Sequence, residues 1–422
     1  MNGNGYRPTD LGRIPDDWEV TPLSEVLTVR AETTQPSKRG TMKYAGLEHI
    51  DSGRPKLKRW GVESEVRSSK NRFYEGDILY GKLRPYLNKV AIAEWDGMCA
   101  TDILVFNTNG VKGSPKYLVN LLHTAEFLKF AISTTTGVNH PRTSWNSLSR
   151  FTFGLPPLSE QKKIAAFLSK IQQAIEVQET NIELVKELKN ALMARLFTEG
   201  LRGEELKETE IGLVPRSWEL KSCAEICDLV TVGVVVRPAS YYVEMGVPAF
   251  RSLNIREDRL DTRFLVFFSQ RDNNLKLAKS KLKFGDVLVV RTGYPGTACV
   301  VPREYEGANC IDLVITRPNN EIVLSGYLSR FFNSPVGKRQ AFKAKYGLAQ
   351  QHLNAGAVKR TIVPIPSIEE QAQFDSTFTT IDRRIELCSI RKNVLEDLFS
   401  SVLSQLMTGQ MRVNNIEFPF DA

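Results

Sequence analysis

The sequence has no run of 18 apolar residues, the length that a membrane-spanning helix needs. Its first five residues, Met-Asn-Gly-Asn-Gly, lack the apolar core of a signal peptide. The six cysteines and four histidines are scattered without the spacing of a zinc site, so we expect reduced thiols and no bound metal. These absences predict a cytoplasmic protein with no membrane partner.

Motifs for catalysis or cofactor binding are also missing. An adenine methyltransferase carries Asn/Asp-Pro-Pro-Tyr/Phe, but the one Pro-Pro pair, at residues 156–157, is flanked by leucines. No Gly-x-Gly-x-x-Gly follows a strand, and no Gly-Lys-Ser/Thr of the Walker type occurs. Glu187 and Lys189 resemble a nuclease Glu-x-Lys pair but fall in a heptad helix, where they fit a surface pair. We therefore expect no catalytic residues and no cofactor. The missing motifs argue against the alternative that the chain is a self-sufficient methyltransferase or nuclease.

The chain has 422 residues, 42% of them hydrophobic and 25% charged, which is ordinary for a soluble protein with two or three domains. Its net charge is +8. A basic balance suits a polyanionic partner, although many basic proteins bind none.

One long helix is predicted from residues 156–161, which read Pro-Pro-Leu-Ser-Glu-Gln, to about Gly200. Ser159 is placed to cap its first turn. Apolar residues recur at spacings of three and four, as in helices that pack along their length against another helix. Gln178 and Lys189 interrupt this seam, which consists of Ile164, Leu168, Ile171, Ile175, Ile182, Val185, Leu192 and Leu196.

A second helix repeats the first 210 residues later. Residues 366–371 read Pro-Ser-Ile-Glu-Glu-Gln, and Gln371 follows Gln161 by 210 positions. Two unrelated helices would rarely share both an opening motif and a register, so we interpret the pair as an internal duplication whose helices pack on each other. Lys392 alone breaks the second seam, which consists of Phe374, Phe378, Ile381, Ile385, Leu395, Phe399, Val402 and Leu406.

The duplication extends into the segments before each helix. A proline followed by Trp18 or Trp218 opens each copy, and we expect both tryptophans in the core. Short apolar runs broken by turn residues then predict β-rich globular domains. The matching segments are 12–19 with 212–219, 73–80 with 282–289, and 99–105 with 309–315.

The predicted fold class is therefore α+β: two similar β-rich globular domains joined by two long antiparallel coiled-coil helices, as a pseudo-twofold internal repeat. The expected parts are a first globular domain over residues 1–155, a first helix over 156–202, a second globular domain over 203–364, a second helix over 365–410 and a tail over 411–422.

The two helix openings, their order and their twofold repetition resemble the specificity subunit of type I restriction-modification systems, over nearly the whole chain. The resemblance implies that each globular copy is a target-recognition domain that reads one half of a bipartite sequence in double-stranded DNA. It implies that the helices set the distance between the half-sites. Methyltransferase subunits, expected to number two, would dock around the helices, and restriction (motor-nuclease) subunits would join through them.

Candidate DNA contacts follow from the residue types that read bases and phosphates. In each copy, a loop after the buried Gly-Asp strand mixes basic, small and aromatic residues, and a polar segment ends the module. The alternatives are a solvated hairpin whose tyrosine packs back on the core and a polar loop without a ligand. The candidates are Lys82, Arg84, Tyr86, Asn88, His140 and Arg142 in the first copy, and Arg251, Asn254, Arg291, Thr292, Tyr294, Gln351 and His352 in the second.

A competing hypothesis is a duplicated coiled-coil scaffold that binds only protein partners and touches no nucleic acid. DNA affinity that falls steeply with log[salt] favours the first interpretation. The absence of duplex binding, even with methyltransferase partners, favours the scaffold.

Overall fold

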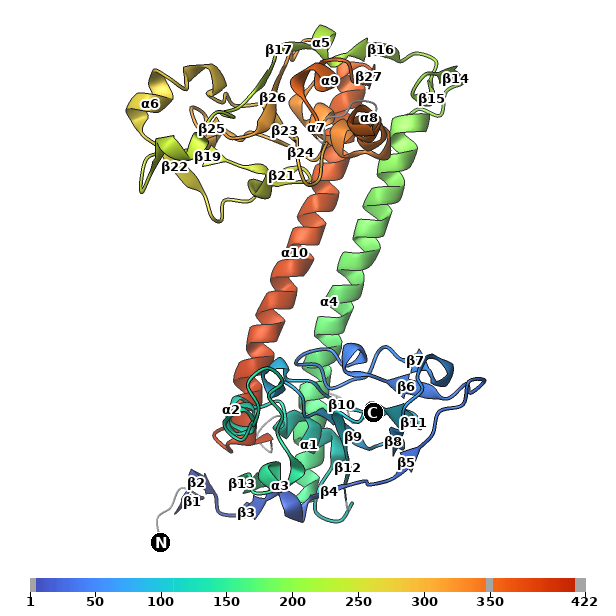
Figure 1. The fold of residues 1–422 in the computed structure, drawn as a ribbon, viewed down its shortest axis with the longest axis vertical. Coiled ribbons are helices and arrows are strands. Elements are labelled where there is room, and N and C mark those ends of the chain that lie inside the picture. Colours follow the sequence, from blue (N-terminus) through green and yellow to red (C-terminus); the bar gives the residue numbers. More distant parts are fainter. Residues whose placement is uncertain (1–4, 109, 347–351, 414–422) are drawn as a thin grey trace. The chain divides into compact units, whose positions relative to one another are not determined.

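The computed structural model describes residues 5–108, 110–346 and 352–413. The chain divides into two compact units: unit 1 comprises Met1–Gln178 and Ile390–Ala422, and unit 2 comprises Glu179–Ser389. Each unit contains one globular module together with part of each of two long helices, α4 (Leu158–Glu199) and α10 (Ile368–Met407) (Figure 1).

Module 1 belongs to unit 1 and is built on two sheets. The antiparallel four-stranded sheet has the order β10 (Val90–Ile92), β9 (Ile78–Gly81), β12 (Ile103–Thr108) and β4 (Leu27–Val29). The five-stranded sheet has the order β5 (Thr33–Thr34), β8 (Lys70–Phe73), β11 (Gly97–Cys99), β6 (Lys43–Ala45) and β7 (Gly61–Val62). The remaining elements are the pairs β1 (Tyr6–Thr9) with β2 (Gly12–Pro15) and β3 (Glu19–Pro22) with β13 (Thr152–Leu155), and helices α1 (Pro115–Leu121), α2 (Ala125–Ser133) and α3 (Trp145–Leu148).

Module 2 belongs to unit 2 and repeats this topology. Its first sheet has the order β17 (Cys227–Val232), β26 (Leu313–Pro318), β23 (Val287–Val290) and β24 (Ala298–Val300). Its second has the order β18 (Tyr242–Val243), β22 (Val266–Phe268), β19 (Val247–Phe250) and β25 (Asn309–Cys310). Its two-stranded pairs are β14 (Leu206–Thr209) with β15 (Gly212–Pro215), β16 (Glu219–Ser222) with β27 (Ile362–Ile365), and β20 (Ile255–Arg256) with β21 (Arg259–Leu260). Its α-helices are α5 (Cys223–Ile226), α6 (Gln270–Asn274), α7 (Ser325–Asn333), α8 (Pro335–Tyr346) and α9 (Ala355–Lys359).

The internal repeat predicted from the sequence is confirmed by this topology. The order β10-β9-β12-β4 in module 1 corresponds to β24-β23-β26-β17 in module 2, and the parallel pair of β11 with β6 corresponds to β25 with β19. The tryptophans that open each copy are 1% exposed, so both are core residues as expected. The β20–β21 pair has no counterpart among the described strands of module 1 and lies in the part of the second copy that is longer.

Both helix openings tie the helix to its own module through the same two side chains. The indole N–H of Trp18 donates to Glu160 Oε2 over 3.0 Å, and that of Trp218 donates to Glu370 Oε2 over 3.4 Å. The next residue, a fully buried glutamine, bonds backbone groups on both sides. Gln161 Nε2 donates to the Lys112 and Pro156 carbonyls, and Gln371 Nε2 donates to the Ile322 and Pro366 carbonyls. The Glu-Gln signature is thus a satisfied buried polar network.

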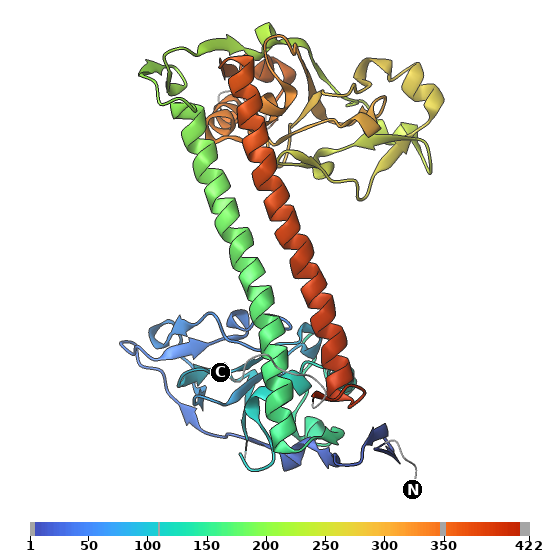
Figure 2. The ribbon, with the colours of Figure 1, turned by 180° about the vertical axis from the view of Figure 1, so that it is seen from behind.

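The two long helices run in opposite directions within each unit. In unit 1, Arg412, just after the end of α10, donates to Glu160 at the start of α4 over 2.8 Å. In unit 2, the N–H of Leu201, just after the end of α4, donates to Glu370 at the start of α10 over 3.1 Å. Segments of α4 and α10 therefore lie side by side and antiparallel in each unit (Figures 1 and 2).

The seam residues near the modules are the best covered. In unit 1, Leu168 and Leu406 are fully buried in the core of module 1, and in unit 2, Phe374 and Phe378 are fully buried in the core of module 2. Here the buried face is wider than a heptad seam, because it covers a module as well as a helix. Ile164, Ile171, Ile175, Leu196 and Val402 are also buried, whereas Ile182, Val185, Leu192, Ile381, Ile385, Leu395 and Phe399 are half-buried.

Two details of the helices differ from the sequence-based expectation. Helix α4 begins at Leu158, so Ser159 lies inside its first turn, and the prediction that Ser159 caps the helix is wrong. The Pro157 carbonyl instead accepts the N–H groups of Glu160 and Gln161 at 2.9 and 3.0 Å. Lys189, a break in the apolar seam, reaches Asp382 over 2.8 Å, so an ion pair replaces apolar packing there.

Candidate nucleic-acid interface

In module 1, the loop after β9 carries four predicted DNA contacts on a kinked backbone. Arg84 and Asn88 have φ angles of 52° and 48° and flank a 3₁₀ turn, Pro85–Leu87. This left-handed conformation is uncommon outside glycine and fixes the direction of the loop. Arg84 and Tyr86 are exposed, with Tyr86 52% exposed, whereas Lys82 and Asn88 are half-buried.

The fold brings the second predicted segment of module 1 onto this loop. The N–H of Arg84 donates to the Pro141 carbonyl over 2.8 Å, and the N–H of Thr143 donates to the Lys82 carbonyl over 3.1 Å. Two stretches that lie more than 50 residues apart in the sequence therefore form one surface. That surface also carries the exposed side chains of His140 and Arg142.

Side chains beneath the loop hold it in place. The Arg142 guanidinium contacts the Asp102 carboxylate at 3.0 Å, and this bond raises the pKa of Arg142. Asn88 lies 3.0 Å from Nδ1 of His123, whose Nε2 lies 3.0 Å from the Val90 carbonyl. Burial of the imidazole lowers the pKa of His123 to about 4, so it is neutral near pH 7.

Module 2 joins the corresponding segments through Arg291. Its backbone carbonyl accepts the N–H of Leu353 over 3.1 Å, and its Nε donates to the Leu353 carbonyl over 3.1 Å. Its Nη1 donates to Asp312 over 2.5 Å, and the side chain is 16% exposed. Tyr294 projects from the same loop and is 82% exposed. Thr292 is half-buried and His352 is exposed. Gln351 lies outside the described residues.

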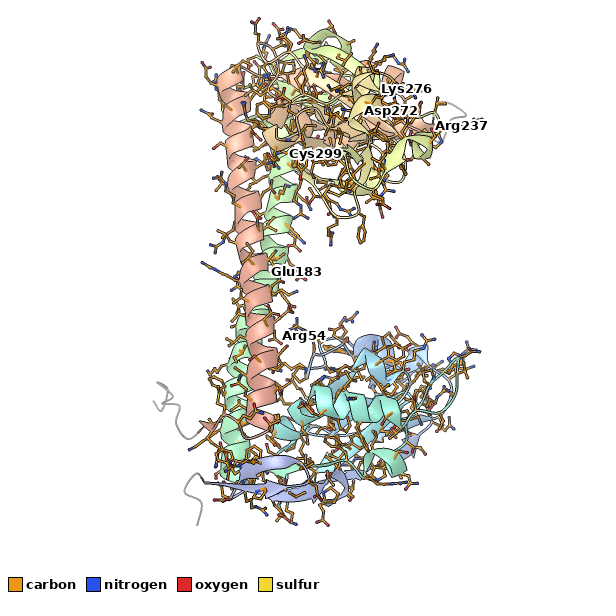
Figure 3. All side chains as sticks on the ribbon, turned by 90° about the vertical axis from the view of Figure 1, so that its left-hand side faces the viewer. Arg54, Glu183, Arg237, Asp272, Lys276 and Cys299 are labelled. Carbon is orange, nitrogen blue, oxygen red and sulfur yellow. The ribbon has the colours of Figure 1, made fainter. Side chains whose placement is uncertain are left out.

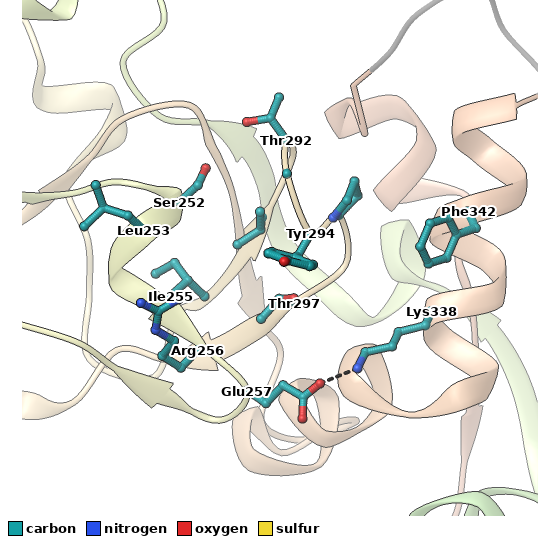
Figure 4. A pocket seen from close by; sticks show the side chains of 13 residues that line it. Ser252, Leu253, Ile255, Arg256, Glu257, Thr292, Tyr294, Thr297, Lys338 and Phe342 are labelled. Atoms are coloured by element: carbon teal, nitrogen blue, oxygen red, sulfur yellow. Dashed lines mark hydrogen bonds and ion pairs between the residues drawn. The ribbon is translucent and has the colours of Figure 1, made fainter. Parts of the chain in front are cut away.

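A cavity of about 630 Å³ opens beside this loop in module 2 (Figure 4). Tyr294 and Thr292 lie on one side, Leu253 and Arg256 on another, and α8 contributes Phe342. Lys338, also on α8, forms an ion pair with Glu257 across the cavity mouth. Of the predicted candidates of module 2, Thr292 and Tyr294 line this concave surface, whereas Arg251, Asn254, Arg291 and His352 do not.

Sequence reasoning missed Lys338, Phe342 and Leu253. The first two lie in a segment that the pattern indicates only as a helix, and Leu253 is an apolar residue between the polar candidates Arg251 and Asn254. Sequence reasoning also gave Asn254 a place at the surface, whereas the side chain is fully buried and its Nδ2 donates to the Asp261 and Arg263 carbonyls at 2.8 and 2.9 Å. Asn254 therefore shapes the following loop and leaves no exposed amide for a ligand. Arg251 donates to the Phe264 carbonyl over 2.6 Å on the same loop.

No group of three or more His, Cys, Asp or Glu side chains able to hold a metal ion occurs in the ranges 5–108, 110–346 and 352–413. Over the same ranges, none of the helices is long and apolar enough to cross a membrane. The six cysteines are free thiols.

The family model for the type I restriction modification DNA specificity domain matches this chain twice, over residues 15–187 and 215–397. The chain belongs to that family. Each match covers one globular module and runs into the long helix that follows it, so the family domain corresponds to the repeat unit seen in the fold.

Two curated relatives match this chain over nearly its whole length. The chain is 24% identical to the putative type I restriction enzyme MjaX specificity subunit of Methanocaldococcus jannaschii, with 97% of each chain covered. It is 23% identical to the MjaVIII specificity subunit of the same organism, with 96% of each covered. A chain from a structure of complex assembly and conformational transition in the type I R-M system has the same fold, with a TM-score of 0.59, 19% identity, and 94% of this chain and 99% of that chain covered.

Proposed function

We propose that this chain is the sequence-specific DNA-recognition subunit of a type I restriction-modification enzyme and reads a bipartite, asymmetric target. Each module takes one half-site in double-stranded DNA through its loop cluster. The observation that carries the proposal is a loop at the same place in both modules, after β9 and after β23, with left-handed residues in each and with backbone hydrogen bonds to a segment about 60 residues further on. A binding surface built twice on one scaffold suits a target with two halves.

The two loop clusters share a framework but differ in their polar side chains. Lys82, Arg84 and Tyr86 of module 1 correspond to Arg291, Gly293 and Tyr294 of module 2. Side chains that reach base edges decide which base is read, whereas backbone and phosphate contacts set register. The two half-sites should therefore differ in sequence.

The proposed division of labour follows the chain: recognition domains over residues 1–155 and 203–364, spacer helices over 156–202 and 365–410, and a tail over 411–422. The helices would set the distance between half-sites and dock two methyltransferase subunits, which in turn would bring restriction subunits. The chain itself would be non-catalytic and would need no cofactor, since methyl transfer and cleavage would belong to those partners.

The competing proposal is a protein-binding scaffold that has no nucleic-acid ligand. A salt titration separates the two, with the chain co-purified with its methyltransferase partners and a genomic duplex library as the ligand. DNA recognition predicts that the logarithm of the binding constant falls linearly with log[salt], since each neutralised phosphate releases a counterion. Assembly with the partners but no duplex binding at low salt would favour the scaffold and refute our proposal.

A further inference from the structure

The stretch of module 2 from residue 251 to residue 264, which includes the predicted contacts Arg251 and Asn254, presents an aromatic ring to solvent. Phe264 is 80% exposed, although burial is the usual state of a phenylalanine side chain. Its φ angle is 56°, and among the described non-glycine residues with positive φ it is the one with an apolar side chain. A bulky residue in this conformation is strained, and such strain persists where surrounding structure enforces it, often at functional sites.

The enforcing structure lies in the same loop. The Arg251 guanidinium donates to the Phe264 carbonyl over 2.6 Å, and the buried Asn254 amide donates to the Asp261 and Arg263 carbonyls. Arg263 forms a two-pronged pair with Asp261 at 2.9 and 2.6 Å. These bonds fix the backbone on both sides of the ring, so the phenyl group is held outward by a braced loop.

The surroundings of the ring match DNA better than an apolar protein partner. Residues 251–264 contain four arginines, at positions 251, 256, 259 and 263, and three carboxylates, at positions 257, 258 and 261, of which Asp261 pairs with both Arg256 and Arg263. The same loop contributes Leu253 and Arg256 to the cavity beside Tyr294, so it is continuous with the proposed interface of module 2. Arginine near a phosphate backbone and an apolar wedge between base pairs are the combination by which proteins unstack and bend a duplex.

We propose that Phe264 inserts between two base pairs at or beside the half-site of module 2 and unstacks them. This proposal rests on the proposed DNA-recognition function and adds a mode of selection to it. A wedge selects sequence through the energy needed to open a base step, which is lowest at flexible pyrimidine–purine steps such as TA and CA. Module 2 would then discriminate at a step where it makes no base-edge hydrogen bond.

The corresponding loop of module 1, residues 51–60, ends in a ring with a different environment. Trp60 is 48% exposed, but the Lys43 ammonium lies 4.0 Å from its ring centroid and Trp95 packs edge-on against it at 5.8 Å. The same loop carries Lys56 and Lys58, which lie 3.5 and 3.6 Å from Glu176 of α4. Arg54 of that loop, labelled in Figure 3, reaches Glu396 of α10 over 2.8 Å. Trp60 is thus held against its own module and lacks the left-handed backbone of Phe264, so we expect unstacking of this kind in the half-site of module 2 and not in that of module 1.

The test uses the complex of this chain with its methyltransferase partners and a duplex that contains the target found from its methylated sites. The fluorescent base 2-aminopurine, whose emission rises on unstacking, is moved one position at a time through each half-site. The methylated adenines are left unlabelled, since methyltransferases extrude their target base from the stack. The wild-type complex should give a rise at one step on the module 2 side. Phe264→Ala and Phe264→Gly should abolish the rise and weaken target binding at least tenfold, whereas Phe264→Trp should retain both.

Two controls separate a wedge from damage to the fold. Leu213→Ala removes another half-exposed apolar side chain from the β14–β15 hairpin and should change neither emission nor affinity. Phe264→Gly relieves the strain of the left-handed backbone. The midpoint of thermal unfolding of this variant should therefore equal or exceed that of the wild type, while its affinity for DNA falls. An unchanged emission profile or unchanged affinity in Phe264→Ala overturns the wedge alone. Failure of the wild-type complex to bind any duplex overturns the wedge and the proposed function together.

Discussion

Asp102 and Asp312 occupy the same place in the two modules but meet different arginines. Asp102 pairs with Arg142 at 3.0 Å, whereas Asp312 pairs with Arg291 at 2.5 Å. In module 1 the counterpart of Arg291 is Lys82, and Arg84, two residues further along the kinked loop, is exposed. In module 2 the guanidinium of Arg291 is engaged beneath the loop and Tyr294 is the exposed group. The repeat located both loops in the sequence, but which arginine an aspartate engages depends on side-chain packing that spacing alone does not encode.

The exposed position of Arg84 gives a prediction for module 1. Arg84→Ala should weaken binding of the target and relax base preference in one half-site only, by about 1–3 kcal/mol if the guanidinium reads a guanine in a two-pronged contact. The readout is affinity for duplexes with single-base changes in each half-site. Arg13→Ala removes the same charge from the β2 strand and should leave base preference unchanged. Unaltered discrimination by Arg84→Ala would refute this role for Arg84.

His123 predicts how the stability of module 1 depends on pH. Burial lowers its pKa from 6.5 to about 4 in the folded state, so between these values the unfolded chain binds the proton more readily. The free energy of unfolding should therefore fall as the pH drops from about 6.5 to about 4, by at most about 3 kcal/mol. Denaturant unfolding across this window measures the effect.

The matched variant for that test comes from module 2, which has Asn333 at the position equivalent to His123. Asn333 bonds the backbone of Ala298 on β24, much as His123 bonds Val90 on β10. His123→Asn should flatten the pH dependence in this window, because asparagine does not titrate. A slope that is the same in both proteins would mean that other groups control acid stability.

At the scale of elements, the long helices were the most predictable part, because a three-and-four spacing of apolar residues that continues over 40 residues is typical only of a long packed helix. Their burial was less predictable. The heptad positions omit Met193, Phe197, Leu403 and Met407, all buried in the cores that the helices share with the modules. Phe197, for example, packs on Tyr327 of α7 as well as on Phe374 of α10. A pattern within one helix does not show that a globular surface also covers it.

The burial of the seam near the modules predicts how strongly single substitutions on α4 lower the free energy of unfolding. Leu168→Ala should lower the free energy of unfolding by about 2–5 kcal/mol, since a fully buried leucine leaves a cavity in the core of module 1. Leu184→Ala, on the same helix but 57% exposed, should change it by no more than about 0.5 kcal/mol. Chemical denaturation of the two variants measures the difference, and equal losses would contradict the assigned packing.

At the scale of the whole molecule, duplication and family membership account for the repeated modules, while the differences between copies carry the proposed specificity. The sequence predicted the repeat from two helix openings and three further matched segments. It did not identify the braced loop that ends at Phe264, because the left-handed backbone of Phe264 and the hydrogen bond that holds it depend on the folded loop rather than on residue spacing. Identity of the bases read likewise depends on side-chain geometry at the interface.

The most direct test of DNA recognition by two unlike modules is the set of methylated genomic positions in cells that contain the methyltransferase partners, with and without this chain. We predict methylation only when the chain is present, at a two-part motif with unlike halves and a spacer of constant length. Arg84→Ala should relax one half and Phe264→Ala should weaken selection on the other side. An uninterrupted single motif, or a methylation pattern that does not depend on this chain, would contradict the central claim.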